Sequence, residues 1–153
     1  MPDWSLSSNL GPLGALPTAP SLARGFVSAV LEGWSMSVLT DTTELIASEL
    51  TTNVVQAATD ADGKPRYDES GSLSLLWLRL LSSGAHLMIE VWDNLPDVFG
   101  APVVQDPDPD EEHGRGLAII DLLSDDWGWE SVPGWNGKRV WALLSADESP
   151  VDL

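Results

Sequence analysis

The stretch Leu73–Asp93, LSLLWLRLLSSGAHLMIEVWD, decides the fold because it holds two candidate strands joined by a short connection. Leu73–Leu80 and Leu87–Trp92 are both rich in apolar residues. The residues 82–85 between them, Ser-Ser-Gly-Ala, have the length of a hairpin connection. Strands joined by so short a connection run antiparallel, so the stretch predicts two neighbouring strands of an antiparallel sheet.

A second pair of candidate strands lies near the end of the chain. Trp127–Val132 and Lys138–Leu144 flank the turn-rich residues 133–137 and predict another hairpin. Three helical patterns accompany the strands, namely Pro20–Gly33, Asp41–Ala58 and Gly114–Leu123. The order helix, helix, strand, strand, helix, strand, strand predicts an α+β fold. We expect a two-layer α/β sandwich whose mostly antiparallel sheet carries its helices on one face.

The remaining segments divide the chain. Residues 1–19 are rich in Ser, Gly and Pro and predict at most one short strand around Trp4–Leu6, while residues 146–153 form a tail. Residues 20–145 make the single domain. Within it, the proline-rich residues 94–113 include an acidic run and predict an irregular lid. A solvated loop is the alternative interpretation of the acidic run.

Composition and charge exclude several function classes. The 153 residues include 7 basic and 24 acidic side chains, which give a net charge of −17. So negative a surface repels nucleic acid and anionic membranes, and we expect neither as a direct partner. The chain has no cysteine, which excludes disulfides, zinc–thiolate sites and thiol catalysis. Its start has no signal-peptide pattern, so the expected location is cytoplasmic.

Glu49 and Asn53 are the first candidate site residues. They lie four residues apart on the second predicted helix, which starts at a capping box formed by Asp41 and Glu44. Residues at this spacing share one face of a helix. An asparagine oxygen suits a magnesium ion that also binds phosphate oxygens, and a glutamate can deprotonate an attacking hydroxyl group. The alternative is that both side chains face solvent.

Asp93 is the second candidate. It ends a strand in which Leu87, Ile89 and Val91 alternate inward. A carboxylate at the end of a buried strand can accept a hydrogen bond from an exocyclic amine. The alternative is an Asx turn over Asp93–Pro96 that only ends the strand.

The third candidate is a glycine-containing run at the start of the third predicted helix, made of Gly114, Arg115, Gly116 and Leu117. Glycines allow backbone amides to approach a phosphate, and the N-terminal end of a helix favours an anion. A plain turn from loop to helix explains the run as well.

Five stretches carry a resemblance to a known family, and they are Ala23–Val27, Glu44–Asn53, Ile89–Asp93, His113–Gly128 and Gly137–Trp141. Together they resemble the GHKL-type ATPase domain, the Bergerat-type ATP-binding fold shared by gyrase-type topoisomerases, heat-shock chaperones, sensor histidine kinases and mismatch-repair ATPases. Within this family, the chain resembles the anti-sigma-factor serine-protein kinases of actinobacteria and other Gram-positive bacteria. The resemblance covers roughly residues 20–144.

The resemblance implies a role for each candidate residue. Asn53 would ligate magnesium, Glu49 would be the catalytic base, and Asp93 would bind the adenine amino group. The run at the third helix would contact the phosphates of the nucleotide through Gly114, Arg115, Gly116 and Leu117. The implied cofactors are ATP and magnesium. The implied activity is that of a regulator that holds a sigma factor inactive or phosphorylates an antagonist protein on Ser or Thr, and it is compatible with a homodimer.

The chain departs from the kinase pattern at three places. Gln56 and Ala57 stand where a basic residue commonly follows the asparagine, and residues 94–96, Asn-Leu-Pro, replace the glycines that usually follow the aspartate. Arg139 stands where a threonine is frequent, and its side chain is expected to supply a compensating cation. The departures at Ala57 and at residues 94–96 favour the alternative function, a catalytically degenerate protein-interaction module of the same fold that acts without phosphoryl transfer. The intact Glu49 and Asn53 favour the kinase.

Five of the eight tryptophans fall on predicted strands, namely Trp77, Trp92, Trp127, Trp129 and Trp141. We expect their large apolar rings to pack against the helices. A binding platform for a partner is the alternative.

Overall fold

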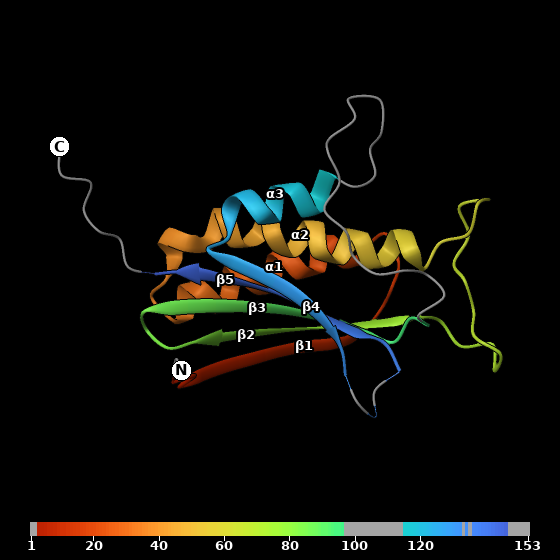
Figure 1. Cartoon of the computed structure of the whole chain (residues 1–153), viewed down its shortest axis with the longest axis horizontal. Coiled ribbons are helices and arrows are strands. Elements are labelled where there is room, and N and C mark those ends of the chain that lie inside the picture. The colour runs from red at the N-terminus through yellow and green to blue at the C-terminus, as the bar shows by residue number, and fades with distance from the viewer. Residues whose placement is uncertain (1–2, 97–114, 133, 135, 147–153) are drawn as a thin grey trace.

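A computed structural model of the chain describes residues 3–96, 115–132, 134 and 136–146. It confirms the predicted α+β fold, a five-stranded antiparallel sheet with helices on one face (Figure 1). The order of the strands across the sheet is β1-β2-β3-β5-β4. The strands are β1 (Leu6–Gly14), β2 (Leu75–Ser82), β3 (His86–Asp93), β4 (Asp126–Ser131) and β5 (Lys138–Ser145). The helices are α1 (Ala19–Gly33), the short 3₁₀ helix η1 (Ser37–Leu39), α2 (Thr40–Ala57) and α3 (Arg115–Leu123).

The core lies between the sheet and the helices. Side chains alternate between the two faces of a strand, so every second residue of β2 and β3 is buried under the helices. The apolar core residues of these two strands are Leu76, Leu78, Leu80, Leu87, Ile89 and Val91. They pack with buried residues of α1 and α2. Among the described residues, no helix is long and apolar enough to cross a membrane.

Two local predictions at the beginning of the chain are wrong. β1 has nine residues, Leu6–Gly14, instead of a short strand around Trp4–Leu6. Among the described strands it pairs only with β2, and an edge strand tolerates glycine and proline, which here fall at a register shift between Leu10 and Leu13. The capping box of Asp41 and Glu44 is also wrong. α2 already starts at Thr40, directly after η1, and no side chain caps it.

Three of the five strand tryptophans do not pack against the helices. Trp77, Trp92 and Trp141 lie one residue out of step with the buried positions of their strands, so they occupy the outer face of the sheet. Trp127 meets the prediction, because it packs against the core and its Nε1 donates a hydrogen bond of 2.8 Å to Asp121 of α3. Trp129 is largely exposed.

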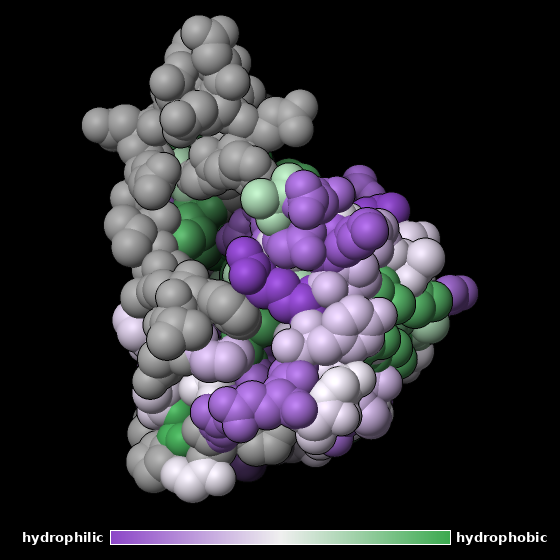
Figure 2. Space-filling view, turned by 90° about the vertical axis from the view of Figure 1, so that its right-hand side faces the viewer, coloured by the Kyte–Doolittle hydropathy of each residue, from purple (hydrophilic) through white to green (hydrophobic). Residues whose placement is uncertain are grey.

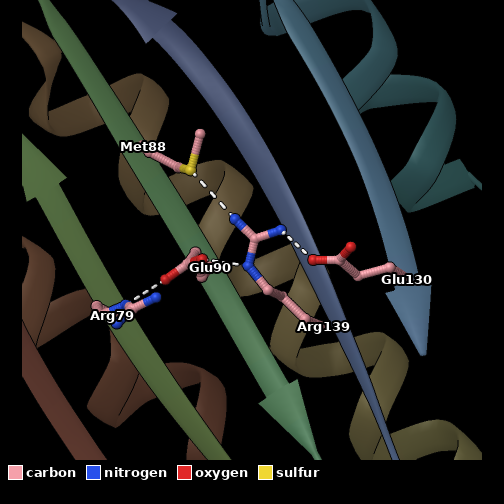
Figure 3. A network of polar contacts seen from close by, with 5 residues as sticks. All are labelled: Arg79, Met88, Glu90, Glu130 and Arg139. Carbon is pink, nitrogen blue, oxygen red and sulfur yellow. Dashed lines mark hydrogen bonds and ion pairs between the residues drawn. The ribbon is translucent and has the colours of Figure 1, made fainter. Parts of the chain in front are cut away.

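A buried carboxylate organises the outer face of the sheet (Figure 3). Glu90 of β3 is only 1% exposed, and it accepts hydrogen bonds from the Nε atoms of Arg79 on β2 and Arg139 on β5. Arg139 also bonds Glu130 of β4 at 3.0 Å. The two guanidinium groups lie 5.6 and 6.0 Å from the centre of the Trp92 ring. This network joins the four strands β2, β3, β5 and β4 on the side away from the helices.

Candidate functional site

One end of the molecule gathers the elements that carry the candidate residues. The C-terminal half of α2, the C-terminal end of β3 and the N-terminal end of α3 lie there (Figure 1). They come together because α2 packs against both β3 and α3. Figure 2 faces this end and shows a mostly hydrophilic described surface, with apolar residues in a recess beside the residues drawn in grey.

Asp93 is fully buried at the end of β3, on the face of the sheet that the helices cover. Its Oδ1 accepts a hydrogen bond of 3.0 Å from the backbone N–H of Leu95, which is the Asx contact that the sequence offered as the alternative interpretation. Its Oδ2 accepts a bond of 2.7 Å from Nζ of Lys138. The Asp93 carboxylate therefore ends the strand and also forms a buried ion pair.

The residues after Asp93 hold the strand end in place. Asn94 Oδ1 accepts a hydrogen bond of 2.8 Å from the backbone N–H of Leu75 in β2, and Leu95 is buried in the core. Residues 94–95, which stand where glycines are usual, thus anchor the chain as it leaves the sheet. Gly137, directly before β5, has φ +153°, and a Cβ there would lie 1.9 Å from the backbone oxygen of Asp93. Only glycine fits so close to that carbonyl group.

Glu49 and Asn53 are both half-buried on α2, beside the fully buried Ile46 and Leu50. Both side chains are therefore partly, not fully, exposed to solvent. Partial burial raises the pKa of Glu49 above 4.5, because desolvation penalises the charged carboxylate. A carboxyl group with a raised pKa is a better proton acceptor at neutral pH than an ordinary one. Neither Gln56, which is exposed, nor Ala57 brings a cation to this part of α2.

The glycine-containing run coincides with the start of α3. The helix begins at Arg115, and Gly116 is its second residue, as the sequence predicted. Leu117 is buried, and its side chain belongs to the core. Gly114 and residues 97–113 of the expected lid, which include His113, lie outside the described residues.

Lys138 contacts the candidate residue Asp93 and was missed by the sequence analysis, whereas Arg139 does not supply the compensating cation that was expected of it. Arg139 lies on the outer face of the sheet with Glu90, away from the face that carries Asp93. Lys138 lies on the helix-facing side, in register with Asp93 across β3 and β5. The available signal was alternation: Lys138 precedes the apolar core residue Val140 by two positions and must share its face.

A recess of about 210 Å³ adjoins the chain just after Asp93. Asn94, Pro96 and Asn136 line one part of it, while Arg66 and Tyr67 of the loop between α2 and β2 line another. The recess is therefore bordered by the same turn that leads into Lys138. No sequence pattern had singled out Arg66 or Tyr67.

Comparison with known families finds a match to one described as "Histidine kinase-like ATPase domain" over residues 13–143, which is most of the chain. No curated protein matches the chain. The matched range includes α2, β3, α3 and the first part of β5, and thus every element that carries a candidate residue.

Proposed function

The chain belongs to the histidine kinase-like ATPase domain family, and on this premise we propose that it is an ATP-dependent protein kinase of the anti-sigma-factor type. It binds Mg-ATP and controls a transcription factor, either by holding a sigma factor inactive or by phosphorylating an antagonist protein on Ser or Thr. The observation that carries the proposal is the half-buried Glu49–Asn53 pair on α2, with the raised pKa of Glu49.

The chemistry of the donor set agrees with a magnesium ion that is shared with phosphate. Among the residues that the structure describes, no three His, Asp or Glu side chains gather into a metal-binding group. Magnesium typically uses few protein ligands and keeps waters and phosphate oxygens. Asn53 supplies one neutral oxygen for such an ion, which when bound neutralises charge on the transferred phosphoryl group.

In the proposed transfer, Glu49 accepts the proton of the Ser or Thr hydroxyl group of the protein substrate. The hydroxyl oxygen forms a bond to the γ-phosphorus atom, the bond between that atom and the β–γ bridging oxygen breaks, and ADP leaves. Phosphoryl transfer depends mainly on positioning and electrostatics. Asp93 receives the exocyclic amine of the base, for which its buried carboxylate is anchored by Leu95 and Lys138.

The test compares two substitutions, one expected to impair Mg-ATP binding and the other expected to impair phosphoryl transfer. Asn53→Ala is expected to weaken Mg-ATP binding in calorimetric titrations, while binding of metal-free nucleotide stays nearly unchanged. Glu49→Ala is expected to leave Mg-ATP affinity within a few-fold and to lower phosphoryl transfer by roughly 10²–10⁴-fold, the usual effect of losing a positioned base. Gln56→Ala and Glu44→Ala are the matched controls, since they remove the same chemical groups elsewhere on α2. Equal losses in the Glu49 and Glu44 variants contradict the assignment of the base.

A binding module without phosphoryl transfer is the second candidate function. It is favoured by the Lys138 contact, because a ligand amine has to share Asp93 with that ammonium group. In this case wild-type protein releases no γ-phosphate with any partner. Glu49→Ala protein then binds and silences its target as well as wild type does.

A further inference from the structure

The ion pair between Asp93 and Lys138 lies at the position where the base of a nucleotide is proposed to bind. Asp93 is fully buried, and the Lys138 side chain is only 15% exposed. The two residues face each other across β3 and β5, with Nζ 2.7 Å from Oδ2. The pair thus places one acceptor and one donor side by side on a mostly apolar sheet face.

Backbone contacts fix the pair on both sides. The N–H of Leu95 holds the other oxygen of the Asp93 carboxylate. On the opposite strand, Gly137 allows the chain to pass close to the Asp93 carbonyl group immediately before Lys138. Since the two backbones are held together here, the carboxylate and the ammonium group stay side by side.

The ammonium group has more hydrogen-bonding capacity than this ion pair uses. A lysine ammonium carries three N–H donors. In the part of the chain that the structure describes, Asp93 is the one acceptor recorded for Nζ of Lys138. Donors therefore remain for a ligand that reaches the Asp93 carboxylate.

We propose that Lys138 is a specificity-determining residue of the base site, and that the Asp93–Lys138 pair accepts 6-oxopurine nucleotides as well as ATP. This inference rests on the proposed nucleotide binding. Adenine presents an amine donor beside a ring-nitrogen acceptor, whereas guanine and hypoxanthine present a carbonyl acceptor beside a ring N–H donor. A lone carboxylate accepts from the amine and repels the carbonyl oxygen. A carboxylate beside an ammonium group can pair with either edge. With adenine, the carboxylate accepts from the amine and the ammonium group donates to the ring nitrogen. With guanine or hypoxanthine, the ammonium group donates to the carbonyl oxygen and the carboxylate accepts from the ring N–H.

The experiment is calorimetric titration of the full chain with Mg-ATP, Mg-GTP and Mg-ITP. Wild-type protein is expected to bind all three with affinities within about ten-fold of one another. In Lys138→Met protein, the affinities for GTP and ITP are expected to fall roughly 10- to 100-fold, the usual loss of a hydrogen bond to a charged group. ATP affinity should change only a few-fold. Lys64→Met is the matched control, since it removes the same charge from an exposed loop residue.

A second substitution keeps the test valid if the Lys138→Met protein does not fold. Lys138→Thr retains a hydroxyl donor for Asp93, and a β-branched residue suits a strand. It is expected to bind ATP and to discriminate against GTP and ITP. The ratio of GTP to ATP affinity is the decisive measurement, because loss of a merely structural contact lowers both affinities together.

Two results overturn the inference while leaving the proposed function intact. The first is wild-type protein that binds ATP but neither GTP nor ITP. The second is an equal loss for all three nucleotides in both Lys138 variants. If wild-type protein binds no nucleotide at all, the proposed function itself fails.

Discussion

Removal of both arginines that contact Glu90 is expected to destabilise the fold strongly, and removal of Glu90 as well is expected to restore most of the loss. Glu90 is 1% exposed, and its two hydrogen-bonding cations are Arg79 and Arg139 (Figure 3). The double variant Arg79→Met/Arg139→Met keeps two long apolar stems but leaves the carboxylate without these cations. Breaking a buried ion pair from one side costs about 3–5 kcal/mol.

The double variant should therefore lose about 3–5 kcal/mol, which lowers the melting temperature by roughly 6–20 °C for a domain of this size. The single variants differ, because the Arg79 side chain is 40% exposed and that of Arg139 only 15%. We expect Arg139→Met to be the more damaging of the two.

The assay is urea unfolding followed by far-UV circular dichroism, which does not depend on Trp92 beside the two arginines. Adding Glu90→Leu to the double variant should recover most of the lost stability, because an apolar replacement of a whole buried ion cluster is often neutral or better. Arg24→Met is the control, since that arginine donates a hydrogen bond to Ser48 on the surface. If the triple variant is as unstable as the double variant, lost packing of the arginine stems causes the destabilisation, and the reasoning is refuted.

Two further predictions concern the candidate site. Glu49→Gln should raise the melting temperature at pH 7, because the folded-state pKa of Glu49 is raised and its ionised form therefore weakens the fold. This gain should fade as the pH falls through the raised folded-state pKa of Glu49 and should be lost below the ordinary value of 4.5, where Glu49 is protonated in both states. Glu44→Gln, on the same helix, is the control variant. A gain that is unchanged at low pH contradicts the desolvation argument. Gly137→Ala should destabilise the chain more than Gly134→Ala in chemical unfolding. Both glycines have positive φ, but only at Gly137 does a new Cβ meet backbone atoms; equal effects contradict the need for this close approach.

The elements of the fold were predictable because their signals are local. Alternating apolar residues and a short connection identify the β2–β3 hairpin, and periodic apolar residues identify the helices. The nine-residue strand β1 was not predictable in this way. Its glycines and prolines are typical of loops, and it exists as a strand because the edge of β2 offers backbone partners. Tertiary pairing outweighed local propensity there.

The candidate site likewise has a part that local sequence patterns predict and a part that depends on tertiary pairing. Glu49 and Asn53 could be predicted from one helix face, and Asp93 from the end of one strand, because each prediction needs only local geometry. The Asp93–Lys138 contact joins residues 45 positions apart. It depends on β5 pairing with β3, a neighbour relation that no local pattern contains. For Leu117, the position in a binding motif did not show that the side chain enters the core.

The neighbours Lys138 and Arg139 show why the face of a strand matters more than position in a motif. The departure from the kinase pattern led us to expect a compensating cation at Arg139. Alternation sends Arg139 to the outer face with Glu90 and Lys138 to the helix-facing side with Asp93. The sheet thus separates two ion clusters made by adjacent residues. A change at Arg139 acts on the stability of the outer face, whereas a change at Lys138 acts on the carboxylate proposed to bind the base.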